Sequence, residues 1–202
     1  MLFRSHYSKL YKTALKKNSF PEIEEKTKKY SLRLEGMLLS EAFKVHNIYP
    51  ETMDMYHIYG VIAMCLEAQE LGLGKKETIA FCNLAFKRRR NFFKRLIALI
   101  NLLPNSYSIA HKWNINDHAK REKDHSITYD SFDVQDGRIE YVISKCSYVD
   151  IFAYYGIRGL CKIFCMTDET AYAGLTRRVK FTRFSDLSDG PSCHDIVERK
   201  TP

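Results

Sequence analysis

An α+β fold is predicted for this chain, with a helical N-terminal half followed by a β-β-α-α-β-β segment with an antiparallel sheet. Up to residue 103, apolar side chains recur at three- and four-residue steps, the spacing of helices with one buried face. After Pro104, alternating polar and apolar residues indicate strands, and Asp136-Gly137 is the signal of a tight turn. Helices and strands that are segregated along a chain favour an antiparallel sheet.

Two helices are expected before residue 50. A short basic helix runs from Ser5 to Lys17, and a second runs to about His46 with Pro21 in its first turn. Glutamates that follow Pro21 stabilise the positive end of the helix dipole. The apolar residues that share one face of the second helix are Leu34, Met37, Leu38, Ala42 and Val45.

A third helix is expected after Pro50, where Thr52 or Asp54 can cap its first turn. Leu71-Gly72-Leu73-Gly74 ends this helix, because glycine adopts the left-handed conformation that commonly terminates helices. Its expected buried residues are Ile58, Val61, Ile62, Cys65 and Leu66.

A fourth helix is expected from Lys75 to Leu103, closed by Pro104. This long amphipathic helix could serve a homo-oligomer as readily as the core of a single chain. Its predicted apolar face consists of Phe81, Leu84, Ala85, Phe92, Leu96, Leu99 and Leu103.

The second half alternates between strands and helices. Helical spacing from Val149 to Ala173 is broken near Gly156 and Gly159, and Gly174 is a natural end. Strands are expected at 125–132, 138–145, 177–184 and 195–199. The first two of these strands should form a hairpin.

We expect a helical region over residues 1–104 and an α+β region over residues 105–202 that carries the functional site, packed as one compact unit. A chain of 202 residues buries about 70% of its unfolded surface, so it needs no disulfide for stability. The apolar fraction of 45%, with 13 Tyr and 12 Phe, excludes a largely disordered protein and predicts an aromatic core.

The positive charge is concentrated in the first half. Residues 1–100 hold 18 Lys and Arg against 10 acids, whereas residues 101–202 hold 14 of each. The basic run at 87–95 spreads around a helix, which suits a solvated face better than a nucleic-acid stripe. With no secretion signal and no apolar run long enough for a bilayer, we expect a cytoplasmic protein without a membrane or nucleic-acid partner.

Four of the six cysteines lie in the tail, at Cys146, Cys161, Cys165 and Cys193. Their irregular spacing and the lack of a secretion signal indicate free thiols. A thiolate is a strong nucleophile, and a nearby imidazole or helix N-terminus lowers its pKa. The alternative is that each cysteine is a small buried hydrophobic residue, which is the common role of a free cysteine.

On a helix, Cys161, Cys165 and Asp168 share one face, since they are four and three residues apart. For Cys161 we favour a buried structural thiol. For Cys165 the acid one turn away makes a nucleophile an equal alternative. Cys146 is expected at a strand-to-helix corner, where a helix N-terminus stabilises a thiolate.

Cys193 and His194 follow a turn and begin a strand, so their side chains should point to opposite faces. His194 would then act as a base toward Cys165 or a water rather than toward Cys193. Zinc is the competing use of cysteine, histidine and aspartate, but no Cys-x-x-Cys pair is present, so no metal site is expected. No phosphate loop, dinucleotide fingerprint or nucleophile elbow is present either, and no cofactor is expected.

Several tail residues follow a known pattern. They are Val142-Ile-Ser-Lys-Cys146-Ser-Tyr, Phe152, Gly156, Phe164-Cys165-Met-Thr-Asp168, Arg183, Asp189-Gly190 and His194-Asp195-Ile196. With them, the C-terminal part of the chain resembles the L-2-amino-thiazoline-4-carboxylic acid hydrolase family. The chain departs from the family where Cys-Asp is usually followed by an aromatic residue, since it has Cys193-His194-Asp195-Ile196 instead.

The resemblance implies hydrolytic opening of a C–N bond in a small cyclic amidine derived from an amino acid. Cys165 would be the nucleophile, Asp168 would position water or the ring nitrogen, and His194 would shuttle a proton. Arg183 or Arg158 would bind the substrate carboxylate. The complete expected site has Cys165, Asp168, His194 and Cys146 as catalytic residues and Arg183, Arg158, Cys193 and Asp195 as substrate-binding residues.

Two other functions stay open at this stage. One is a non-catalytic small-molecule-binding domain of the same fold, in which the altered Cys193-His194 end reflects lost chemistry. The other is a basic helical interaction protein whose first half binds an anionic partner.

Overall fold

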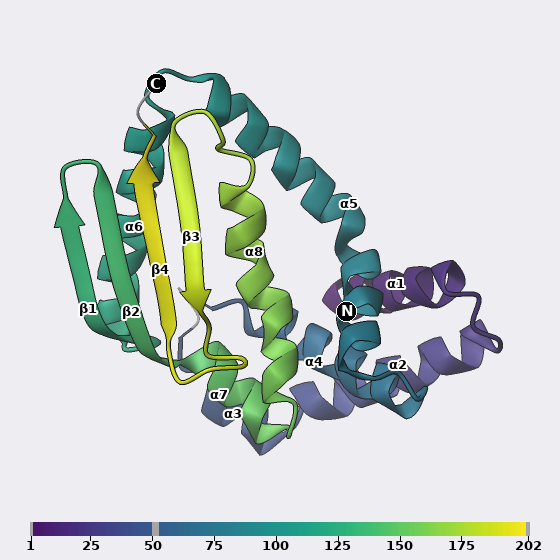
Figure 1. Cartoon of the computed structure of the whole chain (residues 1–202). Helices are drawn as coiled ribbons and strands as arrows, with labels where there is room; N and C mark the ends of the chain where they lie inside the picture. Colours follow the sequence, from purple (N-terminus) through teal and green to yellow (C-terminus); the bar gives the residue numbers. More distant parts are fainter. Residues whose placement is uncertain (1, 50–52, 201–202) are drawn as a thin grey trace. The chain divides into compact units, whose positions relative to one another are not determined.

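The computed structural model describes residues 2–49 and 53–200 (Figure 1). The chain divides into two compact units, Met1–Arg88 and Arg89–Pro202, so the boundary falls inside one long helix. Within the described ranges, the helices all lack the combination of length and apolar character that crossing a membrane requires.

The first unit is helical. The expected second helix is divided, because α2 ends before Leu39 and the Ser40 side chain caps α3 by accepting from the Phe43 N–H. Asp54 caps α4, whereas Pro50 and Thr52 lie outside the described residues. The helices are α1 (Leu2–Lys17), α2 (Ile23–Leu38), α3 (Glu41–His46), α4 (Met55–Glu70) and the first part of α5 (Lys75–Leu102).

The buried face of α4 differs from the prediction at one position. Leu66 is half-buried, and Glu67, which is 3% exposed, lies in the interior instead. Glu67 can be buried because the Nε of Arg33 donates to its Oε1 at 2.5 Å. The other expected residues are buried, namely Ile58, Val61, Ile62 and Cys65.

The second unit contains an antiparallel four-stranded sheet in the order β1-β2-β4-β3. The predicted α+β fold is therefore confirmed. The turn between β1 and β2 uses Gly137 at a φ of 83°, a conformation that glycine adopts without steric cost. The strands are β1 (Ile127–Gln135), β2 (Arg138–Cys146), β3 (Val179–Ser185) and β4 (Cys193–Arg199).

Three helical segments connect β2 to β3: α7 (Ser147–Tyr154), the 3-10 turn η1 (Arg158–Cys161) and α8 (Lys162–Tyr172). A further helix, α6 (Ser106–Asp124), precedes β1 in a segment where no helix was predicted. Its apolar periodicity is weak because polar side chains occupy its half-buried positions, which include Asn114, His118 and Arg121.

Both α6 and α8 pack on one face of the sheet. The buried residues of this core are Ile97, Tyr107, Ala110, Ile139, Leu175, Val179 and Val197. In α5, Ile97 enters the core, whereas Leu96 and Leu99 are 45% and 63% exposed, so the predicted apolar face is only partly right. On the other face of the sheet, side chains such as Phe184 are exposed.

Two glycines with different backbone conformations give opposite predictions for alanine substitution. Gly137→Ala places a side chain in left-handed backbone, and we expect it to lower the free energy of unfolding by about 1 kcal/mol. Gly36→Ala lies in α2 with open space around it and should raise that free energy by roughly 0.5–1 kcal/mol. Urea denaturation followed by circular dichroism would measure both, and a stabilising Gly137→Ala would contradict the turn assignment.

Candidate functional site

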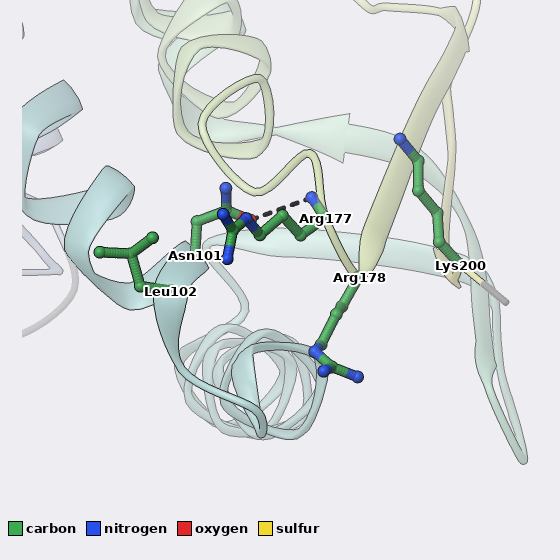
Figure 2. Close-up of a pocket in the computed structure, with 5 residues that line it drawn as sticks. All are labelled: Asn101, Leu102, Arg177, Arg178 and Lys200. Atoms are coloured by element: carbon green, nitrogen blue, oxygen red, sulfur yellow. Dashed lines mark hydrogen bonds between the residues drawn. The ribbon is translucent and has the colours of Figure 1, made fainter. Parts of the chain in front are cut away.

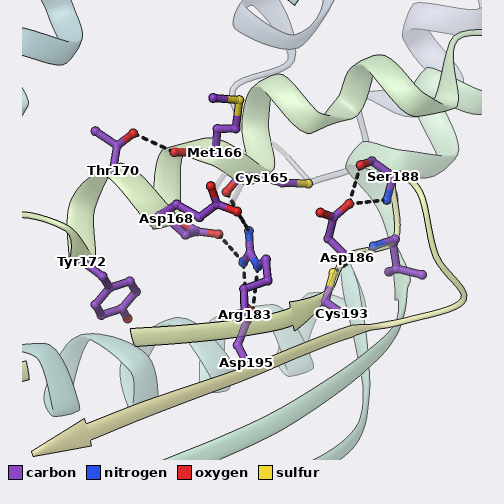
Figure 3. A network of polar contacts seen from close by, with 12 residues as sticks. Cys165, Met166, Asp168, Thr170, Tyr172, Arg183, Asp186, Ser188, Cys193 and Asp195 are labelled. Carbon is purple, nitrogen blue, oxygen red and sulfur yellow. Dashed lines mark hydrogen bonds and ion pairs between the residues drawn. The ribbon is translucent and has the colours of Figure 1, made fainter. Parts of the chain in front are cut away.

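Arg183 on β3 is the centre of a polar network that joins the sheet to α8 (Figure 3). Its Nε and Nη2 donate to the two carboxylate oxygens of Asp195, each at 2.7 Å. Its Nη1 donates to the backbone oxygen of Cys165 at 2.7 Å, and Nη2 also reaches Asp168 Oδ2 at 3.3 Å. Protein acceptors therefore occupy four of the five N–H groups of the guanidinium.

The register of the sheet creates this pair. Arg183 faces Asp195 across β3 and β4, and Asp195 faces Tyr141 on β2. Facing residues project from the same side of a sheet, which here is the side covered by α8. The side chains of Arg183 and Asp195 are 10% and 1% exposed, so each charge is compensated by the other rather than by water.

The four tail cysteines come together, although the segments that carry them are far apart in sequence. Each thiol lies within electrostatic range of the other three, and all four are free. Their surroundings differ, so their ionisation differs as well.

Cys146 lies at the corner between β2 and α7, where the sequence predicted it. Burial raises the pKa of its thiol to about 11, although the backbone N–H groups of Val149 and Tyr148 oppose the shift. Burial likewise raises the pKa of Cys193 to about 12, against the opposing N–H of Leu187 at 3.3 Å. Both thiols are therefore neutral near neutral pH.

Cys165 is half-buried on α8, one turn after the buried Cys161. A hydrogen bond from the Cys161 thiol and the charge of Arg183 lower the pKa of Cys165, although burial and the carboxylates of Asp186 and Asp168 oppose this. The same hydrogen bond and burial raise the pKa of Cys161. Of the two thiols, Cys165 therefore loses its proton more readily than the buried Cys161.

An ion pair between Lys162 and Asp186 lies beside Cys165, and the sequence did not reveal it. Ser188 donates to the same carboxylate through its N–H at 3.0 Å and through its hydroxyl. Burial opposes the ionisation of Asp186, but the bonds from Lys162 and Ser188 lower its pKa. The position of Lys162, three residues before Cys165, was the only available signal, because Asp186 belongs to a turn.

The structure does not bring His194 to Cys165. His194 and Asp195 are adjacent on β4, so their side chains lie on opposite faces of the sheet. The Nε2 of His194 hydrogen-bonds with Glu140 Oε1 at 2.7 Å, and its ring stacks on Phe184 with centroids 4.7 Å apart.

Arg158 has structural partners of its own. Its Nε and Nη2 donate to the backbone oxygens of Leu187 and Gly190, both at 3.0 Å, and so hold the turn that precedes β4. Asp168, in contrast, is 58% exposed and reaches Arg183 through the longest of the hydrogen bonds in that network. The Asp168 carboxylate is therefore more available to a substrate or a water than the Arg158 guanidinium is.

No metal site accompanies these residues: the described ranges contain no group of three His, Cys, Asp or Glu side chains that could hold an ion. A pocket of about 140 Å³ lies at the other end of the sheet, where Arg178 and Lys200 flank β3 and β4 (Figure 2). Its lining residues are Asn101, Leu102, Arg177, Arg178 and Lys200, and none of them belongs to the predicted site.

Comparison with known proteins adds the family. Residues 52–196 match the profile of the L-2-amino-thiazoline-4-carboxylic acid hydrolase family. The chain belongs to this family. The match spans most of the chain, from α4 to the first part of β4, and the family description supports a hydrolase. No curated protein and no solved structure gives a significant match.

The buried pair of Arg183 and Asp195 should contribute far more to stability than an exposed pair on the same strands. Asp195→Ala leaves a buried guanidinium unpaired, and we expect it to lower the free energy of unfolding by about 3–5 kcal/mol. Glu198→Ala removes the partner of Lys180 in an exposed pair and should cost less than about 1 kcal/mol. Urea denaturation measures both, and equal effects would contradict the structural role of Arg183.

Alkylation rates should separate the tail thiols. Iodoacetamide reacts with the thiolate, so Cys165 should be modified first, with a pH midpoint below that of an ordinary thiol. Cys161→Ala removes the hydrogen-bond donor and should move that midpoint to higher pH, whereas Cys161→Ser should move it less. Peptide mapping by mass spectrometry would assign each site, and an unchanged midpoint in Cys161→Ala would refute the thiol pair.

Proposed function

We propose that this chain is a thiol-dependent hydrolase that opens a small carboxylate-bearing cyclic amidine such as 2-amino-thiazoline-4-carboxylate, with Cys165 as the nucleophile. The observation that carries the proposal is the environment of Cys165. Cys165 is half-buried, its sulfur accepts a hydrogen bond from Cys161, and it lies near the Lys162–Asp186 pair and the Arg183 guanidinium. Membership in the hydrolase family supports the reaction class.

The chemistry of the ring explains why a thiolate suits this reaction. The ring carbon between nitrogen and sulfur is electrophilic, and the Cys165 thiolate adds to it while the electrons of the C=N bond move to nitrogen. Collapse of this adduct breaks the bond from that carbon to the ring nitrogen, which leaves as an amine after gaining protons. Water then adds to the same carbon, the Cys165 thiolate leaves, and the product is a ring-opened thiocarbamate with a free amine.

Lys162 is our proposed proton donor to the departing ring nitrogen. It lies on α8 three residues before Cys165, which places both side chains on neighbouring positions of the helix surface. The carboxylate of Asp186 holds the ammonium in place and raises its pKa, despite the opposing effect of desolvation. A charged lysine can supply a proton to a developing amine as the C–N bond breaks.

Asp168 is our proposed group for positioning the hydrolytic water. Its exposed carboxylate lies one turn beyond Cys165, and Arg183 fixes its orientation at 3.3 Å. In this proposal Cys146 and Cys193 shape the wall of the site as neutral thiols, and His194 takes no part in bond making.

Turnover of L-2-amino-thiazoline-4-carboxylate, followed by the appearance of the free amine, tests this proposal. Cys165→Ser should lower kcat by about a thousandfold or more, since it removes the thiolate nucleophile. Lys162→Met and Asp168→Asn should each lower kcat by about 10²- to 10³-fold. Lys180→Ala, on the opposite face of β3, is the matched surface control and should retain the wild-type rate.

Two results would reject the mechanism. If Cys165→Ser turned over the substrate at the wild-type rate, a thiol nucleophile at this position would be excluded. Tight binding of the ring compound by wild type without any turnover would instead favour the non-catalytic binding domain. Trapping the covalent adduct on Cys165 by mass spectrometry after rapid acid quench would support the first step directly.

A further inference from the structure

The inward side of α6 becomes polar toward its C-terminal end. Asn114, His118 and Arg121 follow each other at four- and three-residue steps, so they occupy one side of the helix. Asn114 Nδ2 donates to the Tyr172 hydroxyl at 2.6 Å, and the His118 ring stacks on Phe132 with centroids 3.8 Å apart. The first two polar side chains of this row therefore have partners in the protein.

Arg121 is different, because part of its guanidinium has no partner. Its side chain is 15% exposed, its Nε donates to Asp117 Oδ1 at 3.3 Å near the surface, and the guanidinium also hydrogen-bonds with the Tyr148 side chain. Its Nη1 is fully buried and has no hydrogen-bond acceptor. A buried donor on a charged group costs several times more when it is unpaired than an exposed one, so such a group calls for an acceptor.

The surroundings of Arg121 belong to the same region as the proposed active site. Its Cζ lies 5.7 Å from the ring centroid of Tyr148, and its charge acts on the Cys146 thiol. Tyr129 lies between the two regions: desolvation and the charge of Asp117 raise the pKa of its phenol, and the charge of Arg121 opposes them. The Tyr148 ring in turn lies 5.3 Å from the ring of Phe164, the residue before Cys165, so Arg121 and α8 share this neighbour.

A second buried atom in this corner also has no partner. The Oγ of Ser126 is buried without a hydrogen bond, and the backbone oxygen of the same residue accepts from Ser147 N–H at 3.0 Å. Ser126 directly precedes Ile127, which pairs with Cys146 across β1 and β2. Arg121 contacts Tyr148 and Ser126 accepts from Ser147, so both unsatisfied groups border the start of α7, and each can donate to a ligand oxygen.

We propose that Arg121 binds the carboxylate of the ring substrate, an inference that rests on the proposed function. The two arginines that the sequence suggested for this role are already committed to protein acceptors, Arg183 to Asp195 and Arg158 to backbone oxygens. Arg121 keeps a buried Nη1 with no acceptor, and a carboxylate oxygen is a strong acceptor for a guanidinium N–H.

A protein–ligand double-mutant cycle tests this assignment. The probes are 2-amino-thiazoline-4-carboxylate and 2-amino-thiazoline, which lacks the carboxylate, and binding is measured by calorimetry on Cys165→Ser so that no turnover occurs. We expect the carboxylate compound to bind about 30-fold more tightly than the bare ring, and Arg121→Gln to remove that difference. The affinity for the bare ring should not change.

Arg121→Lys keeps the charge but loses the planar fork, so it should retain only part of the difference, and it replaces Arg121→Gln if the latter does not fold. If Arg121 has only a structural role, Arg121→Gln should weaken the binding of both ring compounds equally, and this result would overturn the inference. An unchanged preference for the carboxylate in Arg121→Gln, or no binding of either ring by the folded protein, would overturn it as well. The protein could also prefer the carboxylate compound in a way that depends on Arg121 while the wild type shows no turnover. That result would support this inference and reject the proposed function.

Discussion

The ion pair between Arg183 and Asp195 is the constraint around which the second unit is organised. Asp195 comes from a central strand, Arg183 from an edge strand, and the guanidinium reaches from there to the backbone of α8 at Cys165. A single side chain thereby fixes the distance between the sheet and the helix that carries the reactive thiol. Because both charges are buried, the pair has strict geometric demands, and neither partner can be replaced alone without an uncompensated charge.

The cysteines show how one residue type acquires different properties from its surroundings. Cys146 and Cys193 accept backbone N–H groups, yet burial dominates and both remain neutral thiols. Cys165 has a thiol donor in Cys161 and lies near a guanidinium, so its pKa is lowered from the ordinary value although burial opposes the shift. Four neighbouring thiols are therefore not four nucleophiles, because desolvation and hydrogen bonding decide which thiol ionises most readily.

Much of the fold was predictable from local patterns. Asp136-Gly137 defined the hairpin, and the glycines near residue 156 separated α7 from the segment that follows. Helix α6 was missed for a physical reason: a helix is recognised by an apolar face, and the inward side of α6 carries Asn114 and Arg121. The corner at Cys146 and the opposite directions of Cys193 and His194 followed from strand geometry. The partners of Arg183 and Lys162 did not, because they depend on register and on a turn that no periodicity describes.

The turn between β3 and β4 has a consequence for how this protein can vary. Its Asp186 holds Lys162, its Leu187 and Gly190 oxygens accept from Arg158, and its Leu187 N–H points at the Cys193 sulfur. Connections between strands usually tolerate inserted residues because few contacts fix their path. Here every extra residue would displace at least one of these anchors, so this connection should keep a constant length among homologues that share the same chemistry.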